Sequence, residues 1–317
     1  MYEKYVHLRM KKCILFFLLA ICLIQCGTAD KSTENNPGEF PTELVNFVPY
    51  KNNPVFSATG KATWDNQIRE RGYILKENNE WYLWYTGYTD INDTKYLGYA
   101  TSPDGITWTR YQDNPIYNGG WVEDMCVLKD NDTYYMFAEG KGDTAHWLTS
   151  NDRIHWTENG NLNIHRSNGE PIEAGPYGTP TVMKEVDTWY LFYERNDSAI
   201  WLATSPDLKT WTNVQDEPVL VRGPENYDKY GVAMNQVIKY RGLYYGYYHA
   251  TAFPDWSEWS TNVAVSKDLI HWKKYQNNPI IDNNKSSGIL VNDGKRYRLY
   301  TMHPEVNLYF PVTDSAQ

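Results

Sequence analysis

The sequence predicts an all-β fold made of five similar sheets, and two features of the chain support this. Aromatic residues make up 15% of the 317 residues, with 27 Tyr and 13 Trp against 9 Phe, and such side chains are enriched in strands. Five segments also share one order of strand, polar turn and aromatic strand. Their second strands are expected to begin 52 to 55 residues apart, a period typical of repeat architectures, at Trp81, Tyr134, Trp189, Tyr244 and Arg296.

A second hairpin follows each of the first four, and its turn reads Ser-x-Asp-x-x-x-Trp. The Asp side chain can hydrogen-bond the backbone of the turn, and the Trp ring can pack between neighbouring sheets. We therefore expect these residues to be structural, and we expect each repeat to contain four antiparallel strands. The four turns span residues 102–108, 150–156, 205–211 and 266–272.

Five four-stranded sheets would leave many strand edges unpaired, and radial closure protects such edges. The sequence therefore predicts a five-bladed β-propeller with four antiparallel strands per blade. The segment 50–56 resembles two Asn-Pro segments, at Asn114 and Asn278, that follow outer strands. Because it precedes the first hairpin, we expect this segment to supply the outermost strand of the fifth blade and to close the ring.

The N-terminus resembles an export signal. A basic stretch at 10–12 precedes an apolar run that is too short to cross a hydrocarbon core of about 30 Å comfortably. The run ends Leu23-Ile24-Gln25-Cys26, which is similar to a bacterial lipobox with Cys26 as the lipidated residue; cleavage after Ala29 is the alternative. The predicted organisation is a signal and lipobox over 1–26, a flexible tether over 27–42 and the propeller, as catalytic domain, over 43–317. The expected location is the bacterial cell envelope, or outside the cell if cleavage follows Ala29.

Charge and cysteine content exclude several classes of partner. The formal net charge is −9, and nonspecific binding of nucleic acids or anionic membranes requires a basic surface. We therefore expect no nucleic-acid partner, and contact with a membrane only through the lipid anchor. Removal of the signal leaves Cys26 and Cys126, so no disulfide framework is expected. Cys126 is most simply a small core residue.

Propeller topology predicts where a site would lie. The innermost strand of each blade starts at one face and the second strand returns to it, so first-strand starts and second-strand ends share one mouth. The starts align at Arg71, Asp124, Thr179, Met234 and Ser287, and the ends at Thr86, Glu139, Glu194, His249 and Thr301. Loops between blades add Trp64, Asp65, Glu70, Glu123, Glu173, Asp228 and Asn235.

The mouth is therefore expected to crowd carboxylates around the axis. Like charges and partial desolvation should raise the pKa of at least one of them. Hydrolysis of a glycosidic bond with inversion needs such a carboxylic acid and a second carboxylate about 6.5 to 9.5 Å away that activates water. Asp124 is the best placed, because a carboxylate at the start of an innermost strand is hard to explain as solvated surface. The alternative for each other acid is a solvated loop position or a pair with an arginine.

The hairpins and the Ser-x-Asp-x-x-x-Trp turns resemble the five-bladed propeller glycoside hydrolases, including families 32, 43, 117 and 130, over essentially the whole mature chain. The segment 121–126, Trp-Val-Glu-Asp-Met-Cys, is similar to the Glu-Asp-Pro-Arg strand of family 130, whose Asp is the proton donor. The resemblance implies that role for Asp124. The arginine that helps to bind phosphate in the phosphorylase members aligns with Cys126, which favours water as the acceptor.

The chain departs from family 43 at two positions. That family has its general acid at the start of blade three, where this chain has Gly178-Thr179-Pro180, and its base in blade one, where this chain has Arg71. The candidate partners of Asp124 are therefore displaced acids: Glu194, Asp65 and Glu173. In some family 43 members an axial histidine helps to hold calcium, so the resemblance adds a structural calcium near the axis, beside His249, to the expectations. The predicted chemistry requires no cofactor.

The sequence as a whole predicts a glycoside hydrolase, inverting and acting on the end of an oligo- or polysaccharide. The alternatives are a phosphorylase of family 130 type and a sugar-binding lipoprotein without catalysis. Three arginines, Arg69, Arg71 and Arg195, suggest an anionic sugar, unless they pair with neighbouring acids. The predicted substrate-binding residues are Arg71, Glu70, Glu123, Glu139, Arg195, Asn235, His249, Trp64 and His303.

Overall fold

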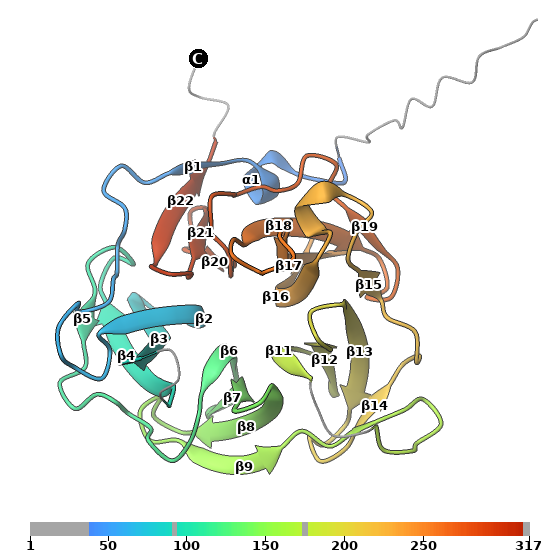
Figure 1. Cartoon of the computed structure of the whole chain (residues 1–317), viewed down its shortest axis with the longest axis horizontal. Coiled ribbons are helices and arrows are strands. Elements are labelled where there is room, and N and C mark those ends of the chain that lie inside the picture. Colours follow the sequence, from blue (N-terminus) through green and yellow to red (C-terminus); the bar gives the residue numbers. More distant parts are fainter. Residues whose placement is uncertain (1–37, 91–93, 173–176, 313–317) are drawn as a thin grey trace, which may run out of the picture. The chain divides into compact units, whose positions relative to one another are not determined.

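A computed structural model describes residues 38–90, 94–172 and 177–312, except for the side chain of Glu70. Five antiparallel sheets stand around a common centre (Figure 1), and the described helices are only the short α1 (Thr42–Val45) and a single 3₁₀ turn, η1 (Asn226–Asp228). The prediction of an all-β five-bladed propeller is confirmed. Neither described helix is long and apolar enough to cross a membrane.

Four of the blades follow chain order from the centre outwards. The first contains β2 (Gln67–Glu77), β3 (Glu80–Tyr88), β4 (Tyr96–Ser102) and β5 (Thr109–Arg110). The second contains β6 (Glu123–Asp130), β7 (Thr133–Gly140), β8 (Thr144–Ser150) and β9 (Thr157–Asn161). The third contains β11 (Gly178–Glu185), β12 (Thr188–Glu194), β13 (Ala199–Ser205) and β14 (Trp211–Asn213). The fourth contains β16 (Gly231–Tyr240), β17 (Leu243–Thr251), β18 (Ser260–Ser266) and β19 (Trp272–Lys274).

The third sheet departs from the predicted four strands. Two short strands join it, β10 (Ile164–His165), which runs parallel to β14, and β15 (Leu220–Val221), which pairs with β13. Both belong to the connections into and out of the blade, so they extend its outer edge and leave the inner hairpin unchanged.

The fifth blade closes the ring with an N-terminal strand, as predicted. It contains β20 (Ile289–Asn292), β21 (Tyr297–Thr301), β22 (Asn307–Pro311) and, on the outside, β1 (Phe47–Pro49). The prediction that the segment 50–56 is the closing strand is wrong in its bounds: the strand is β1, just before it, and the segment continues along β22 through backbone bonds to Leu308 and Val306. The Asn53 side chain bonds both the N–H and the carbonyl of Leu308, as Asn114 does with Tyr99 and Asn278 with Val263. The likeness among the Asn-Pro segments therefore reflects one edge motif used in three blades.

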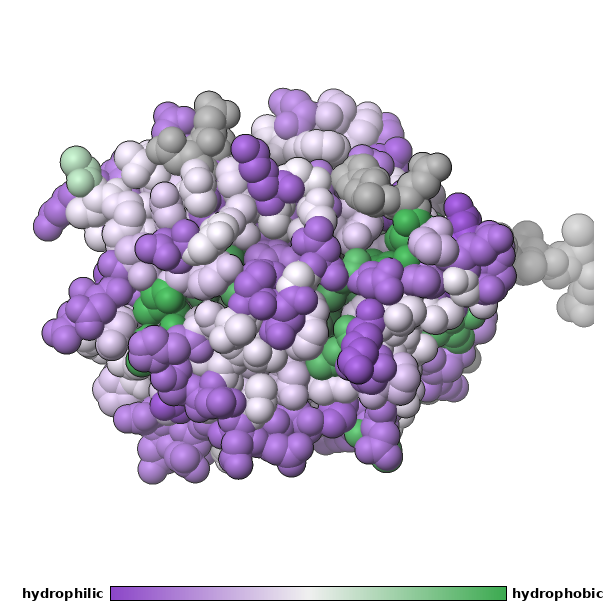
Figure 2. All heavy atoms as spheres, turned by 90° about the horizontal axis from the view of Figure 1, so that it is seen from below, coloured by the Kyte–Doolittle hydropathy of each residue, from purple (hydrophilic) through white to green (hydrophobic). Residues whose placement is uncertain are grey.

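The core lies within and between the blades. In the Ser-x-Asp-x-x-x-Trp turns, Asp104 accepts the backbone N–H groups of residues 106 and 107, and Trp211 is fully buried, so these residues are structural as predicted. The surface in Figure 2 is mostly hydrophilic with small, separate apolar patches. Cys126 is buried, and its Sγ lies 3.4 Å from the Val182 backbone N–H that donates to it.

Neighbouring blades are also tied at the face opposite the mouth. A lysine near the end of each of three innermost strands pairs with an acid on the preceding blade: Lys129 with Glu77, Lys184 with Asp130 and Lys239 with Glu185. These pairs repeat at blade spacing and hold the innermost hairpins in a ring.

The folded part of the chain begins before the boundary predicted at residue 43. The Glu39 side chain pairs with Lys273, its carbonyl accepts a hydrogen bond from Tyr245, and Phe40 packs against Tyr275 with ring centroids 4.9 Å apart. The end of the predicted tether therefore packs against the fourth blade, because it carries an aromatic side chain. The predicted signal, the lipobox and Cys26 lie outside the described residues.

Candidate active site

At the mouth, bulges turn the innermost strands toward the axis. Glu123 pairs with Glu139 between β6 and β7, and Gly178 pairs with Glu194 between β11 and β12. After each of these pairs the register shifts by one residue. Asp124 and Thr179 lie within these bulges with φ of 46° and 44°, in the left-handed region that non-glycine residues rarely adopt. Bulges re-aim side chains at such positions. Strand starts and strand ends therefore meet at one mouth, as the topology predicted.

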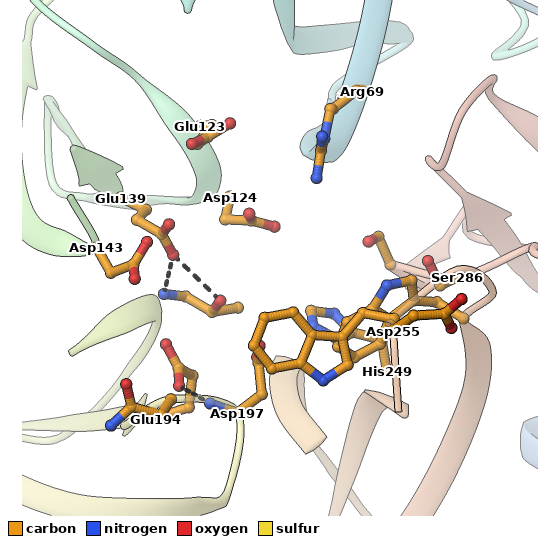
Figure 3. A pocket seen from close by; sticks show the side chains of 15 residues that line it. Arg69, Glu123, Asp124, Glu139, Asp143, Glu194, Asp197, His249, Asp255 and Ser286 are labelled. Carbon is orange, nitrogen blue, oxygen red and sulfur yellow. Dashed lines mark hydrogen bonds between the residues drawn. The ribbon is translucent and has the colours of Figure 1, made fainter. Parts of the chain in front are cut away.

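A cavity of about 480 Å³ opens at this mouth (Figure 3). It is lined by six of the ten aligned strand-start and strand-end residues: Asp124, Thr179, Ser287, Glu139, Glu194 and His249. Seven lining residues carry carboxyl groups: Glu123, Asp124, Glu139, Asp143, Glu194 and Asp197 from the second and third blades, and Asp255 from the turn after β17. Arg69 is the only one of the lining side chains with a permanent positive charge.

Arg71 lies behind Asp124 and is not among the residues that line the cavity. Its backbone N–H donates to the Asp124 carboxylate at 3.1 Å, and its fully buried guanidinium donates to backbone carbonyls. These carbonyls come from the next three blades: Asp124, Pro180, Met234 and Asn235. This corrects the prediction that Arg71 binds substrate. Its guanidinium is engaged in hydrogen bonds that connect four blades beside the cavity.

Glu139 and Glu194 face each other across the entry to the third blade. Oε2 of Glu139 accepts the Thr179 N–H at 2.9 Å, and Oε2 of Glu194 accepts the Asp197 N–H at 2.5 Å (Figure 3). A β-carbon on Gly178 would stand 2.2 Å from Glu139 Oε2 and 2.7 Å from Glu194 Oε1. Only a glycine leaves room for both side chains at this point.

Burial and mutual repulsion hold protons on this cluster. Burial, followed by the charge of Asp197, raises the pKa of Glu194 to about 8, and burial with the charge of Asp124 raises the pKa values of Asp197 and Glu123 to about 7. Burial and the neighbouring acids raise the pKa of Glu139 well above its usual range. Burial also raises the pKa of Asp124, against the opposing charge of Arg71. The cavity therefore contains both neutral and ionised carboxyl groups near neutral pH.

The fourth blade contributes a histidine and two indoles. Burial, with the charge of Arg71, lowers the pKa of His249 to about 3, so the ring is neutral and its Nδ1 accepts a hydrogen bond from Asn235 at 2.8 Å. Trp259 packs edge-on against this ring with centroids 4.8 Å apart. Trp256 lines the cavity and keeps 49% of its surface exposed.

Several predicted site residues lie elsewhere. The Asp65 carboxylate is buried outside the cavity, where it accepts bonds from Arg110 at 2.8 Å, Tyr85 and Thr63; this corrects the expectation that it is catalytic. Trp64 stacks on Tyr85 in the first blade, so it is not at the cavity surface.

The positions of five other predicted residues differ from one another. Asn235 is fully buried behind His249, and Arg195 is half-buried and not among the lining residues. His303 borders the site: the charge of Arg69 and, above all, burial lower its pKa to about 4, while the charge of Asp124 opposes them. Glu173 and the side chain of Glu70 lie outside the described part of the chain.

Sequence reasoning missed the residues that follow second strands. Asp143 lies in the turn between β7 and β8, Asp197 between β12 and β13, and Trp256 between β17 and β18. The same topological rule would have found them, because a turn that leaves a second strand at the mouth also faces the mouth.

Metal binding is a separate question for this cavity. Among the described residues, no group of three or more His, Cys, Asp and Glu side chains is arranged to hold a metal ion. A structural calcium beside His249 stays a prediction.

No protein-family model matches the chain. A curated relative, the 1,2-β-oligomannan phosphorylase of a Thermoanaerobacter species, is 26% identical over 221 residues, which are 65% of this chain and 72% of that protein. A solved putative glycoside hydrolase from Parabacteroides distasonis superposes with a TM-score of 0.66 and 16% identity, over 86% of this chain and 97% of the other.

Another similar structure belongs to the family 130 mannoside phosphorylases, a family that contains glycoside hydrolases that target β-1,2-mannosidic linkages in Candida mannan. It has a TM-score of 0.65 and 14% identity, over 83% of this chain and 93% of the other. The similar proteins are thus glycoside hydrolases and phosphorylases that act on sugars. This chain has the five-bladed β-propeller fold of those enzymes.

Proposed function

We propose that this protein is a glycoside hydrolase that cleaves a neutral sugar from the end of an oligosaccharide, with Asp124 as the proton donor. The observation that carries the proposal is the position of the Asp124 carboxyl, which is buried in a cavity lined by six other carboxyl groups and whose pKa is raised by that burial. A carboxylic acid that keeps its proton near neutral pH can protonate a leaving glycosidic oxygen. A cavity of about 480 Å³ at the mouth of the propeller holds the end of a chain better than its middle.

The charge of the cavity favours water over phosphate as the acceptor. Seven carboxyl groups line it against one arginine, so a phosphate dianion would enter a repulsive field. Cys126, which aligns with the phosphate-binding arginine of family 130, is buried against Val182 and supplies no positive charge. The same field favours a neutral sugar over the anionic one suggested by the arginines of the sequence.

The relatives indicate which sugar to test first. One is a 1,2-β-oligomannan phosphorylase, and another belongs to a family with hydrolases of β-1,2-mannosidic linkages. We therefore propose β-linked mannosides as the substrate class. Trp256 offers an exposed indole at the mouth, where a sugar ring next to the cleaved one could stack.

The test is sugar release from β-1,2-mannobiose and longer oligomannosides, with and without inorganic phosphate. We expect free mannose without phosphate, and a loss of roughly 10²- to 10⁴-fold in kcat for Asp124→Asn. The matched control is Asp187→Asn, an exposed carboxylate in the turn between β11 and β12 at the opposite face. Formation of mannose 1-phosphate only when phosphate is present would replace the hydrolase by a phosphorylase, and binding without turnover on a broad glycan panel would replace it by a binding protein.

A further inference from the structure

We propose that Asp197 is the general base that activates water in this cavity, rather than Glu194, one of the three partners of Asp124 that the sequence suggested. The assignment rests on the proposed hydrolase function and on the position of Asp197, which lies across the cavity from Asp124 in Figure 3. Asp124 comes from the second blade and Asp197 from the turn after β12 in the third. An inverting hydrolase needs its two carboxyl groups on opposite sides of the sugar ring.

The backbone of Asp197 is fixed although it lies in a turn. Its N–H donates to Glu194 at 2.5 Å, and its carbonyl accepts the N–H of Val232, on the fourth blade, at 2.8 Å. Asn196 and Asp197 both have φ of 52°, a conformation that persists in non-glycine residues only where the surroundings hold it. A residue bound to two blades can keep its carboxylate in place for catalysis.

Each of the three lining glutamates has one oxygen engaged in a hydrogen bond. Oε2 of Glu139 accepts the Thr179 N–H, Oε2 of Glu194 accepts the Asp197 N–H, and Oε1 of Glu123 accepts the indole N–H of Trp121 at 2.6 Å. The two other lining acids, Asp143 and Asp255, are exposed to solvent. Within the described residues, no hydrogen bond is formed to the carboxylate of Asp197, so both its oxygens are available to accept a proton from water.

The charges also favour this division of roles. After burial, the charge of Asp197 is the largest cause that raises the pKa of Glu194, so an ionised Asp197 keeps Glu194 protonated. After burial, the charge of Asp124 is the largest cause that raises the pKa of Asp197. When Asp124 holds its proton this repulsion disappears and Asp197 ionises more readily. The pair therefore favours the reactive state with a neutral Asp124 and an ionised Asp197.

The step balances with these two residues and water. Asp197 takes a proton from water as the water oxygen bonds to the anomeric carbon. The bond from that carbon to the glycosidic oxygen breaks, its electron pair stays on the oxygen, and Asp124 supplies the proton. The products are the inverted free sugar and an alcohol, with Asp124 ionised and Asp197 protonated. Exchange of one proton with solvent restores the starting state.

The test compares Asp197→Asn, Asp197→Ala, Glu194→Gln and Asp124→Asn on β-1,2-mannobiose and on a dinitrophenyl β-mannoside, whose leaving group needs no acid. We expect Asp197→Asn to lose roughly 10²- to 10⁴-fold in kcat on both substrates. Asp124→Asn should lose that much on mannobiose and far less on the dinitrophenyl substrate. Added azide should restore turnover of the dinitrophenyl mannoside by Asp197→Ala, with α-mannosyl azide as the product. Thermal melting shows that each variant is folded, and Asp187→Asn is the control.

The outcomes separate the two proposals. Suppose that the wild type cleaves both substrates. If Asp197→Asn is then active, or if only Glu194→Gln responds to azide, the assignment of Asp197 is overturned while the hydrolase function stands. A wild type that cleaves neither substrate, nor any glycan of a broad panel, overturns the hydrolase function and this assignment with it.

Discussion

The carboxylates of Glu139 and Glu194 meet at the point where a side chain on Gly178 would begin. A β-carbon there would lie 2.2 Å from an oxygen of Glu139 and 2.7 Å from one of Glu194. Both oxygens therefore lie within the roughly 5 Å over which like charges disfavour ionisation of their neighbours. The strand start that carries the general acid in family 43 is here a glycine, and the acids reach its place from two adjacent second strands.

We predict that Gly178→Ala disrupts the site. The new methyl group must displace both glutamates, so we expect a loss of about 1 to 3 kcal/mol in the free energy of unfolding, as for other overpacked positions, and a lower kcat. Denaturant unfolding and the mannobiose assay measure the two effects. Gly120→Ala is the control, because a β-carbon at Gly120 meets no atom within 4 Å. Equal stability and activity of the two variants would contradict the packing described here.

A second prediction concerns the pH dependence of stability. Burial and the charge of Asp197 raise the pKa of Glu194 from 4.5 to about 8 on folding. Between these values the folded state binds more protons than the unfolded state, so the free energy of unfolding falls as the pH rises from about 4.5 to about 8. Glu194→Gln cannot ionise and should show a shallower decline, since Glu139, Glu123 and Asp197 still contribute. Urea titrations across this pH range measure how the free energy of unfolding of each protein changes with pH. Equal slopes for the wild type and Glu194→Gln would exclude a raised pKa of Glu194 in the folded state.

The architecture could be predicted because three signals recur along the chain: the spacing of the hairpins, the Ser-x-Asp-x-x-x-Trp turns and the Asn-Pro segments at the outer edges. The five second strands begin within one residue of the predicted positions, from Glu80 in the first blade to Tyr297 in the fifth. The strand-end rule also placed Glu139, Glu194 and His249 at the cavity. A periodic sequence constrains these positions because every blade repeats the same backbone path.

The predictions of site residues that were wrong concern side chains that bind partners from other segments of the fold. Asp65 follows Trp64 in a loop. Nothing in the sequence indicates that it forms an ion pair with Arg110, on the outer strand of the same blade. The alignment predicts Arg71 at a strand start, but it lies inside β2 at a bulge, and its guanidinium reaches carbonyls on three other blades. Such contacts between distant segments are set by the packed structure and leave no periodic signal.

The buried position of Arg71 leads to a third prediction. Arg71→Met leaves the carbonyls of Asp124, Pro180, Met234 and Asn235 without this donor, at about 1 to 3 kcal/mol for each buried group left unsatisfied. We expect a large loss of stability, seen as a thermal transition at much lower temperature or as failure to fold. Arg195→Met, at a half-buried position outside the cavity lining, should change stability far less. A stable Arg71→Met variant with only weakened sugar binding would restore the substrate-binding role.

The last prediction concerns Trp256 at the mouth of the cavity. Its indole is 49% exposed and lines the cavity, so it can stack on a sugar beyond the one that is cleaved. Such contact binds the ground state and the transition state alike, and its loss raises KM with little change in kcat. Trp256→Ala should therefore raise KM for oligomannosides several-fold, while Trp256→Phe keeps most of the affinity. Because a dinitrophenyl mannoside has no second sugar, its KM should change less. An equal rise in KM for both substrates would place the indole against the cleaved sugar itself.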